Sequence, residues 1–258
     1  MYVQFRKSLR IAQLISLIII LIPGKGSSKL LEELFNSGLD SIAAVDNTLL
    51  DVTAISDEEE NQIGTNLKRR ILAENKSGTN HKHRPSDVLQ KLLPHCQRKA
   101  IKYDTSIIKE DEFNAYTVAG GKIFLNTGLL ENLNNVDELA FVIAHEIAHN
   151  ELKHCIHMIQ YSYHASKIQP TLGALVQLAY SSYKHPFSKE EERQADEYAV
   201  HLMCKAGFKK SGAVSFFRAL EKQEAKWYNA NLRAVNDFIS THPTAVERRQ
   251  RIEQITTP

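Results

Sequence analysis

The alternation of hydrophobic and polar residues predicts a chain that is mostly helical. Residues 29–50 carry apolar side chains at helical spacing. A second helix is expected to begin at Ser56, which a glutamate follows three residues later in the order of a capping box. Residues 74–85 are polar and interrupted by glycine and proline, so they predict a loop. Residues 86–100 then indicate a helix bent at Pro94.

A short region of strands interrupts this helical pattern. Residues rich in β-branched and aromatic side chains occur at 101–108, 115–118 and 122–125. Gly120 and Gly121 lie between the last two runs and predict a hairpin turn. After residue 128 the pattern is helical almost to the end. The stretch 168–180 is too short and broken to span a membrane, so we expect it to pack in the core. The whole pattern predicts an α+β fold that is mainly α.

Composition and charge are those of an ordinary globular domain. The 258 residues are 43% hydrophobic and 24% charged, which is close to the averages for such domains. The net charge of +2 gives no electrostatic reason to expect nucleic acid as a partner. Cys96, Cys155 and Cys204 are too few and too irregular for a disulfide framework. A bridge between Cys155 and Cys204 and buried thiols are both compatible with this spacing.

The N-terminus has the features of an export signal. Three basic residues precede the apolar run 11–22, and small residues follow it. Gly24 and Gly26 fit the positions before a signal-peptide cleavage site, although an uncleaved anchor fits the same segment. The run is shorter than the roughly 17–25 residues that span a membrane.

Two N-terminal segments are therefore expected ahead of the main domain. Residues 1–26 would form a signal peptide or a membrane anchor, and residues 27–55 a helical lead-in. The protein would then be exported to a periplasm, or be associated with a membrane through its N-terminus and face away from the cytosol. An anchored membrane protein of an organelle is the alternative.

The candidate chemistry centres on an HExxH sequence. His145 and His149 are four residues apart, so on a helix they share one face and can reach one zinc ion. Glu146 lies beside that ion without ligating it, where it can take a proton from water. The apolar, Gly- and Pro-free residues ahead of His145 favour a buried helix. A chance match on a surface helix is the alternative for this motif alone.

A third ligand is expected from an acidic run downstream. Glu192 and Asp196 are again four residues apart, which suits a metal ligand and a carboxylate that holds the outer ring nitrogen of a ligand histidine. The same run fits a solvated helix start with Ser188 as its N-cap. The residues alone do not separate Glu191 from Glu192 as the ligand.

Several motifs, in order, resemble the M48 family of zinc metallopeptidases, in particular its Oma1-like and bacterial periplasmic branches. The motifs are residues 56–64, 114–130 and 137–149 with His154 after them, Glu192 to Asp196, and Thr241-His242-Pro243 with Arg248. The resemblance implies a zincin domain of the gluzincin type over residues 56–258, with the small sheet or hairpin beside the HExxH helix. It implies one zinc per chain, His145, His149 and Glu192 as ligands, and Glu146 as the general base.

The resemblance also suggests roles outside the ligand set. His242 would donate a hydrogen bond to the oxyanion of the transition state, and Arg248 would hold the segment that carries it. Apart from the resemblance, a place beside the HExxH helix would let one strand pair with an extended substrate by strand addition, and its residues are Lys122, Ile123, Phe124, Leu125 and Asn126.

The implied function is an endopeptidase that acts on unfolded or flexible polypeptides of a membrane or envelope, in protein quality control. Two alternatives stay open. One is a zinc-binding chaperone or adaptor with little proteolysis, which the intact base Glu146 disfavours. The other is a hydrolase of non-peptide amides, such as a cell-wall crosslink, because the same metal chemistry serves both reactions.

Overall fold

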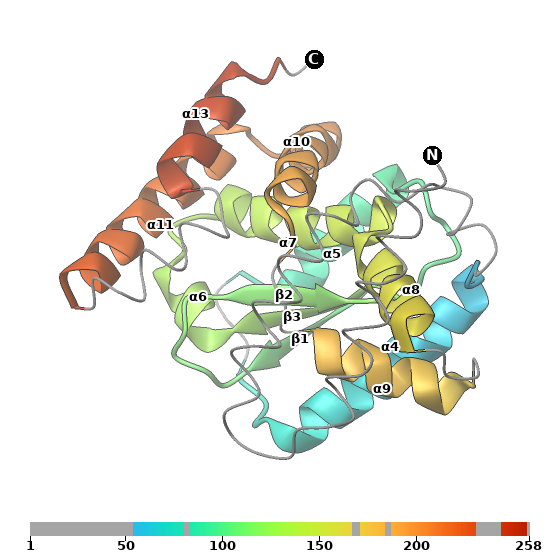
Figure 1. The fold of residues 1–258 in the computed structure, drawn as a ribbon. Coiled ribbons are helices and arrows are strands. Elements are labelled where there is room, and N and C mark those ends of the chain that lie inside the picture. Colours follow the sequence, from blue (N-terminus) through green and yellow to red (C-terminus); the bar gives the residue numbers. More distant parts are fainter. Residues whose placement is uncertain (1–53, 80–82, 167–170, 184–186, 231–243, 257–258) are drawn as a thin grey trace, which may run out of the picture.

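Helices surround a small three-stranded sheet (Figure 1) in the computed structural model, which describes residues 54–79, 83–166, 171–183, 187–230 and 244–256. The elements are α4 (Asp57–Glu74), α5 (Pro85–Leu92), the 3-10 helix η1 (Leu93–His95), β1 (Asp104–Ile108), β2 (Ala115–Val118), β3 (Lys122–Asn126), α6 (Thr127–Asn132), α7 (Val136–Glu151), α8 (His154–Ser166), α9 (Leu172–Ser182), α10 (Lys189–Lys205), α11 (Ser211–Ala230) and α13 (Ala245–Gln254). The prediction of an α+β, mainly helical fold is confirmed.

The central strand of the sheet is β3, because the strand order is β1-β3-β2. It pairs in parallel with β1 and antiparallel with β2, where Ala115 lies opposite Leu125. The β2–β3 pair is the predicted hairpin. Gly120 and Gly121 have φ values of +75° and +71° in its turn, a region that glycine enters without steric cost.

The position of β3 contradicts one prediction. Both edges of this strand are already paired within the sheet, and all five of its residues are buried. It therefore has no free backbone groups with which to add an extended substrate. The sequence suggested otherwise because a strand's neighbours on both sides depend on pairing between distant segments, here between β1 and β3.

Alternation of side chains along β3 divides the interior into two cores. Ile123 and Leu125 point to one face and pack with α5, α7, α10 and α11. Phe124 points to the other face and packs with α4, α8 and α9. A strand covered on both faces is expected to be apolar throughout its middle. Leu175 and Ala179 of α9 are buried in the second core, as expected for residues 171–180 of the predicted core segment.

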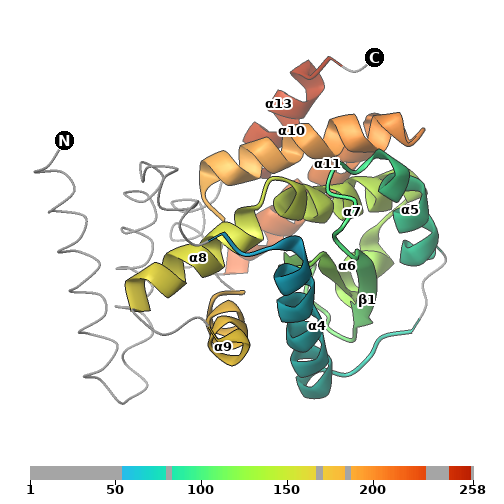
Figure 2. The same ribbon diagram turned by 90° about the vertical axis from the view of Figure 1, so that its right-hand side faces the viewer.

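The helix α7 joins the sheet to the C-terminal helices. It packs against β2 and β3 on one side and against α5, α10 and α11 on the others. In Figure 2, α10 lies over α7, with α13 beyond it, while α4 runs beside β1 on the far side from α10. Nothing described has both the length and the apolarity of a membrane-spanning helix. The segments expected at residues 1–26 and 29–50 lie outside the described residues.

Two local predictions have mixed outcomes. Ser56 and Ser188 cap α4 and α10, as predicted for both helix starts. Each completes a capping box, which was predicted only for Ser56. The helix predicted for residues 86–100 is too long, since α5 ends at Leu92 and a single 3-10 turn follows at Pro94. After this turn, the backbone N–H groups of Gln97 and Arg98 donate to the carboxylate of Glu151, at 2.6 Å from Gln97, and so do not continue a helix.

The cysteines remain thiols, and Cys155 and Cys204 are not bridged. Cys96 and Cys155 are buried, which is one of the two arrangements left open by their spacing.

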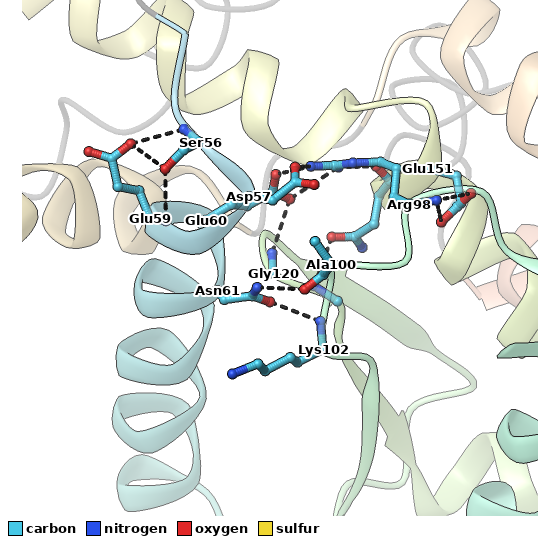
Figure 3. Close-up of polar contacts among 12 residues, drawn as sticks. Ser56, Asp57, Glu59, Glu60, Asn61, Arg98, Ala100, Lys102, Gly120 and Glu151 are labelled. Atoms are coloured by element: carbon cyan, nitrogen blue, oxygen red, sulfur yellow. Dashed lines mark hydrogen bonds and ion pairs between the residues drawn. The ribbon is translucent and has the colours of Figure 1, made fainter.

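A polar cluster around Arg98 ties the start of α4 to the hairpin turn and to the end of α7 (Figure 3). The Arg98 guanidinium bonds Asp57 at 2.5 Å and the fully buried Glu60 at 2.6 Å. It also donates to the backbone carbonyl of Asn150 at 2.6 Å. Glu60 in turn accepts the N–H of Gly120 at 3.2 Å. The cluster therefore connects four segments through charge-assisted hydrogen bonds.

The hairpin turn is held by two further contacts. The Asn150 side chain accepts from Gly121 N at 2.9 Å and donates to Thr117 Oγ1 at 2.8 Å. A Cβ on Gly120 would lie 2.5 Å from the Glu60 carbonyl oxygen, so α4 can approach the turn this closely only at a glycine.

Candidate metal centre

The HExxH residues lie on α7, which is buried along most of its length. The helix begins after Asn135, whose side chain accepts the backbone N–H of Glu138 as an N-cap. His145, Glu146 and His149 are all buried, and one helical turn brings both imidazole rings to the same side. The predicted buried helix is confirmed.

Three side chains converge beside this helix. The Nε2 atoms of His145 and His149 are 3.1 Å apart. Glu192 reaches them from α10, with one carboxylate oxygen 3.4 Å from His145 Nε2 and the other 3.5 Å from His149 Nε2. Four ligands around zinc at about 2.0–2.2 Å form a tetrahedron with edges of about 3.3–3.6 Å. The three side chains are therefore spaced as ligands of one ion, and the described residues contain no second group of this kind.

The charges around the rings favour a cation at this point. Burial lowers the pKa of His149 well below its usual range, so this ring is neutral and its lone pair can bind a metal. Burial would also lower the pKa of His145, but the carboxylates of Asp196 and Glu192 outweigh it and raise that pKa to about 10. The proton that they hold on His145 is one that a bound metal displaces.

Glu146 is buried beside the three ligands without belonging to them. Burial raises its pKa to about 7, with the Glu192 carboxylate adding to the shift and His145 opposing it. A carboxyl group with a pKa near 7 can both accept and return a proton at neutral pH. This is the property required of a general base that later acts as an acid.

Asp196 and Arg248 form the outer side of the centre. Asp196 Oδ1 lies 3.1 Å from His145 Nδ1, the ring nitrogen opposite the one that faces Glu192. Arg248 binds both oxygens of Asp196, at 2.6 and 2.8 Å, and one oxygen of Glu192 at 3.0 Å. Burial would raise the pKa of each of these two carboxyls, but Arg248 and the histidines hold both below their usual ranges. Both acids are therefore ionised.

The formal charge of the centre matches a divalent ion. The buried carboxylates of Glu146, Glu192 and Asp196 face a single arginine, Arg248, which leaves −2 when all are ionised. Two neutral imidazoles add no charge. A bound dication that displaces the His145 proton would balance this charge.

Comparison with known proteins identifies this arrangement. The model of a family described as Peptidase family M48 matches residues 81–256. The chain belongs to peptidase family M48. Its HExxH helix and the Glu192 that joins it both lie within the matched part of the M48 domain.

Several M48 relatives match at similar levels. The mitochondrial metalloendopeptidase OMA1 of Schizosaccharomyces pombe is 28% identical over 178 residues, which are 66% of this chain and 51% of that protein. The metalloprotease YcaL of Escherichia coli is 26% identical over 153 residues, covering 55% of this chain and 57% of YcaL. The β-barrel assembly-enhancing protease of Escherichia coli is 24% identical over 152 residues, 52% of this chain and 31% of the other. The chain thus spans between about a third and somewhat more than half of these relatives.

The helix cap determines which of the two glutamates faces the histidines. In α10, the side chain of Glu191 bonds the Ser188 backbone N–H at 2.8 Å and completes the capping box. This leaves Glu192, the next residue around the helix, to face His145 and His149. The S-x-x-E spacing at Ser188 would have assigned Glu191 to the cap from the sequence alone.

Two residues beside the candidate metal centre were missed or undervalued. His154 is buried, and its Nδ1 lies 3.0 Å from Nδ1 of His149. Its position five residues after His149 was the only signal. Phe187 stacks on the His149 ring with centroids 3.8 Å apart and an angle of 17°. Phe187 directly precedes the cap of α10, and no motif marks it.

Two other predicted site groups are not seen at the centre: one is outside the described residues and one is bound elsewhere in the sheet. His242 and the rest of residues 231–243 fall outside the described residues. Lys122 of β3 is buried, and its ammonium group bonds Asp104 at 3.0 Å and the Lys102 carbonyl. We expected Arg248 to hold the segment 241–243. In the described part of the chain, it binds Glu192 and Asp196 of α10.

Proposed function

We propose that this chain is a zinc-dependent endopeptidase that hydrolyses peptide bonds of unfolded or membrane and envelope proteins, as part of protein quality control. The observation that carries the proposal is the spacing of 3.1, 3.4 and 3.5 Å among the ligand atoms of His145, His149 and Glu192. Glu146 lies directly beside them with a pKa raised to about 7 by burial.

The chemistry of the reaction divides between the metal and the chain. A zinc ion held by these three side chains supplies a Lewis acid that activates water and polarises a peptide carbonyl. Glu146 accepts a proton from the attacking water and passes it to the leaving amine as the carbon–nitrogen bond breaks. Asp196 orients His145, and Arg248 fixes Asp196 by a two-point contact.

We further propose that His242 donates a hydrogen bond to the developing oxyanion. Arg248 supports this, because it lies six residues further along the chain and is in contact with Glu192. Replacing His242 by alanine should lower kcat by about 10²–10³ with the zinc content unchanged, as for loss of one oxyanion donor. Wild-type kcat in this variant would exclude the role.

Substrate binding is proposed at β2 in place of β3. β2 is an edge strand of the described sheet and packs beside α7, which carries the catalytic glutamate. An extended substrate could pair with its free edge through backbone hydrogen bonds, which favours flexible segments over a fixed sequence. Peptides with N-methylated amides near the cleaved bond should then be cut more slowly than the parent peptide. Equal rates would exclude strand addition.

The location and substrate class are proposed from the N-terminus and the relatives. The names of these relatives include a mitochondrial metalloendopeptidase and a β-barrel assembly-enhancing protease, which supports action at a membrane or envelope. We propose that residues 1–26 direct export or anchor the chain, and that residues 56–258 form the peptidase domain. N-terminal sequencing should find a start near Ser27 in soluble extracts or the full chain in membranes. Full-length protein in the cytosol would contradict export.

The decisive test measures metal content and proteolysis together. The purified full chain should contain about one zinc and degrade unfolded casein, and a chelator should abolish the activity until zinc is restored. Glu146→Gln is the matched control, because it should keep zinc and the fold while losing turnover by about 10²–10⁴. Zinc without casein cleavage would favour a chaperone or adaptor, and release of muropeptides without casein cleavage would favour an amide hydrolase of the cell wall.

A further inference from the structure

The two histidine ligands have different partners on their outer nitrogens. His145 Nδ1 faces the carboxylate of Asp196, an acceptor that fixes the ring by charge. His149 Nδ1 faces another imidazole, His154 Nδ1, at 3.0 Å. An imidazole can either donate or accept, so this contact alone does not decide which nitrogen of His149 keeps a lone pair for the metal.

The position of His154 is built into the turn after α7. His154 is the first residue of α8, and Lys153 before it has a φ of +64°. A non-glycine residue in this left-handed region costs stability and persists where the surroundings require it. The turn at Lys153 starts α8 at His154 and places the His154 ring in contact with the His149 ring. The ring centroids of the two histidines are 5.1 Å apart.

Gln194 of α10 decides the direction of the hydrogen bonds. Its Oε1 is 3.3 Å from His154 Nε2, and its Nε2 donates to Glu190 Oε1 at 2.9 Å. The opposite amide orientation would place an oxygen against the Glu190 carboxylate, where neither group can donate. The Glu190 carboxylate therefore fixes the Gln194 oxygen towards His154.

The remaining protons follow from this orientation. An amide oxygen only accepts, so His154 Nε2 must carry the proton, and in the neutral ring His154 Nδ1 is then an acceptor. His149 must donate from Nδ1, which leaves a lone pair on His149 Nε2. That atom is the one that lies 3.1 Å from His145 Nε2 and 3.5 Å from Glu192.

We propose that His154 and Gln194 are positioning residues that select the metal-binding tautomer of His149, through a hydrogen-bond relay running from His149 to Glu190. The relay rests on the proposed zinc site, and it acts through His149 without touching substrate. All three hydrogen bonds point away from the metal centre and end at Glu190, whose side chain is 58% exposed. The two ligand histidines are thus oriented by different chemistry, one by a buried ion pair and one by neutral groups.

The first test reads the tautomers directly in zinc-free protein. Nitrogen NMR of 15N-histidine-labelled full chain should show His149 protonated at Nδ1 and His154 at Nε2. In Gln194→Met, which removes the acceptor on the partly exposed surface of α10, the preference of both rings should weaken. In the double variant Gln194→Glu with Glu190→Gln, which keeps an oxygen acceptor beside His154 and a donor beside that oxygen, it should persist. A wild-type His154 protonated at Nδ1 would overturn the relay.

The second test measures zinc affinity by competition with a chromophoric chelator. His154→Leu should weaken zinc binding by about 10–100-fold, the usual effect of losing an outer partner of a ligand histidine. His154→Asn should restore most of it, because an amide oxygen can accept from His149 Nδ1. Glu197→Gln, an exposed change on the same helix, is the matched control and should leave the affinity unchanged.

The outcomes separate this inference from the proposed function. If the wild-type chain binds zinc and cleaves casein while His154→Leu and Gln194→Met keep the wild-type zinc affinity and tautomers, the relay is wrong and the peptidase proposal stands. If the wild-type chain binds no zinc, the proposed function fails. The NMR result would then still show whether His154 and Gln194 fix the His149 tautomer.

Discussion

Two arginines in this protein make almost the same contacts but serve different regions. Arg98 binds the carboxylates of Asp57 and Glu60, and Arg248 binds those of Glu192 and Asp196, all at 2.5–3.0 Å. Both guanidinium groups are largely buried. The difference lies in what else the acids face.

In the Arg98 cluster the acids face a backbone hydrogen-bond donor and solvent. Glu60 accepts the Gly120 N–H. The Asp57 side chain is 40% exposed, so water also solvates its charge. In the Arg248 cluster the acids face two imidazoles whose Nε2 atoms point at one another. An arginine–carboxylate pair therefore does not by itself mark a functional site. An excess of buried negative charge beside two converging imidazole nitrogens does.

The largest expected effect is structural. Arg98→Met should lower the free energy of unfolding by about 3–5 kcal/mol, because it leaves the buried Glu60 without its charged partner. Urea unfolding should show the same loss with and without zinc, since the cluster lies outside the metal centre. Arg98→Lys should lose less, because it keeps the charge but not the planar fork. A loss confined to the zinc-bound form would show that the two clusters are coupled.

The next effect concerns the metal alone. Zinc binding to four ligands is worth about 10–16 kcal/mol, so one ligand contributes roughly 3–4 kcal/mol, or about 10²–10³ in affinity. Glu192→Ala should show this loss in chelator competition, while Glu191→Ala should keep zinc and lose only its share of the helix cap. The opposite result would place the ligand one residue earlier.

Arg248→Met should have a smaller effect on zinc than removal of a ligand. Asp196 would lose its two-point contact and hold His145 less firmly, so zinc affinity should fall by about 10–100-fold. Unlike in Arg98→Met, the change in unfolding free energy should differ between the zinc-bound and zinc-free forms. Equal losses in both forms would make Arg248 a purely structural residue.

The smallest effects come from two matched helix caps. Ser56 caps α4, which carries the partners of Arg98, and Thr244 caps α13, which carries Arg248. Ser56→Ala and Thr244→Ala should each cost about 1 kcal/mol of stability in thermal unfolding. Only Thr244→Ala should also weaken zinc binding. A change in zinc affinity from Ser56→Ala would remove the distinction between the two regions.

Local rules predicted much of this architecture. The capping box at Ser56, the N-cap at Ser188, the hairpin at Gly120 and the HExxH helix each depend on a few neighbouring residues, and each was predicted. The places of Glu192 and Asp196 on one helical face followed from four-residue spacing in the same way.

The failures share a dependence on distant segments. The helix at 86–100 stops early where Glu151, 54 residues from Gln97, takes its backbone donors. The central position of β3 comes from parallel pairing with β1. The Arg98 cluster was not predicted at all, because Glu60 and Arg98 meet only after α4 and the segment after α5 have packed.

The contact between Arg248 and Glu192 also determines when, during synthesis, the metal centre can be completed. Synthesis starts at the amino end, so the two histidines of α7 leave the ribosome first, and Arg248 follows His149 by 99 residues. At about 5–20 residues per second this interval lasts roughly 5–20 s. Until α13 arrives, Glu192 and Asp196 lack the cation that balances them, and the centre is incomplete. The candidate metal centre is therefore completed only after Arg248 has been synthesised and α13 has packed against α10.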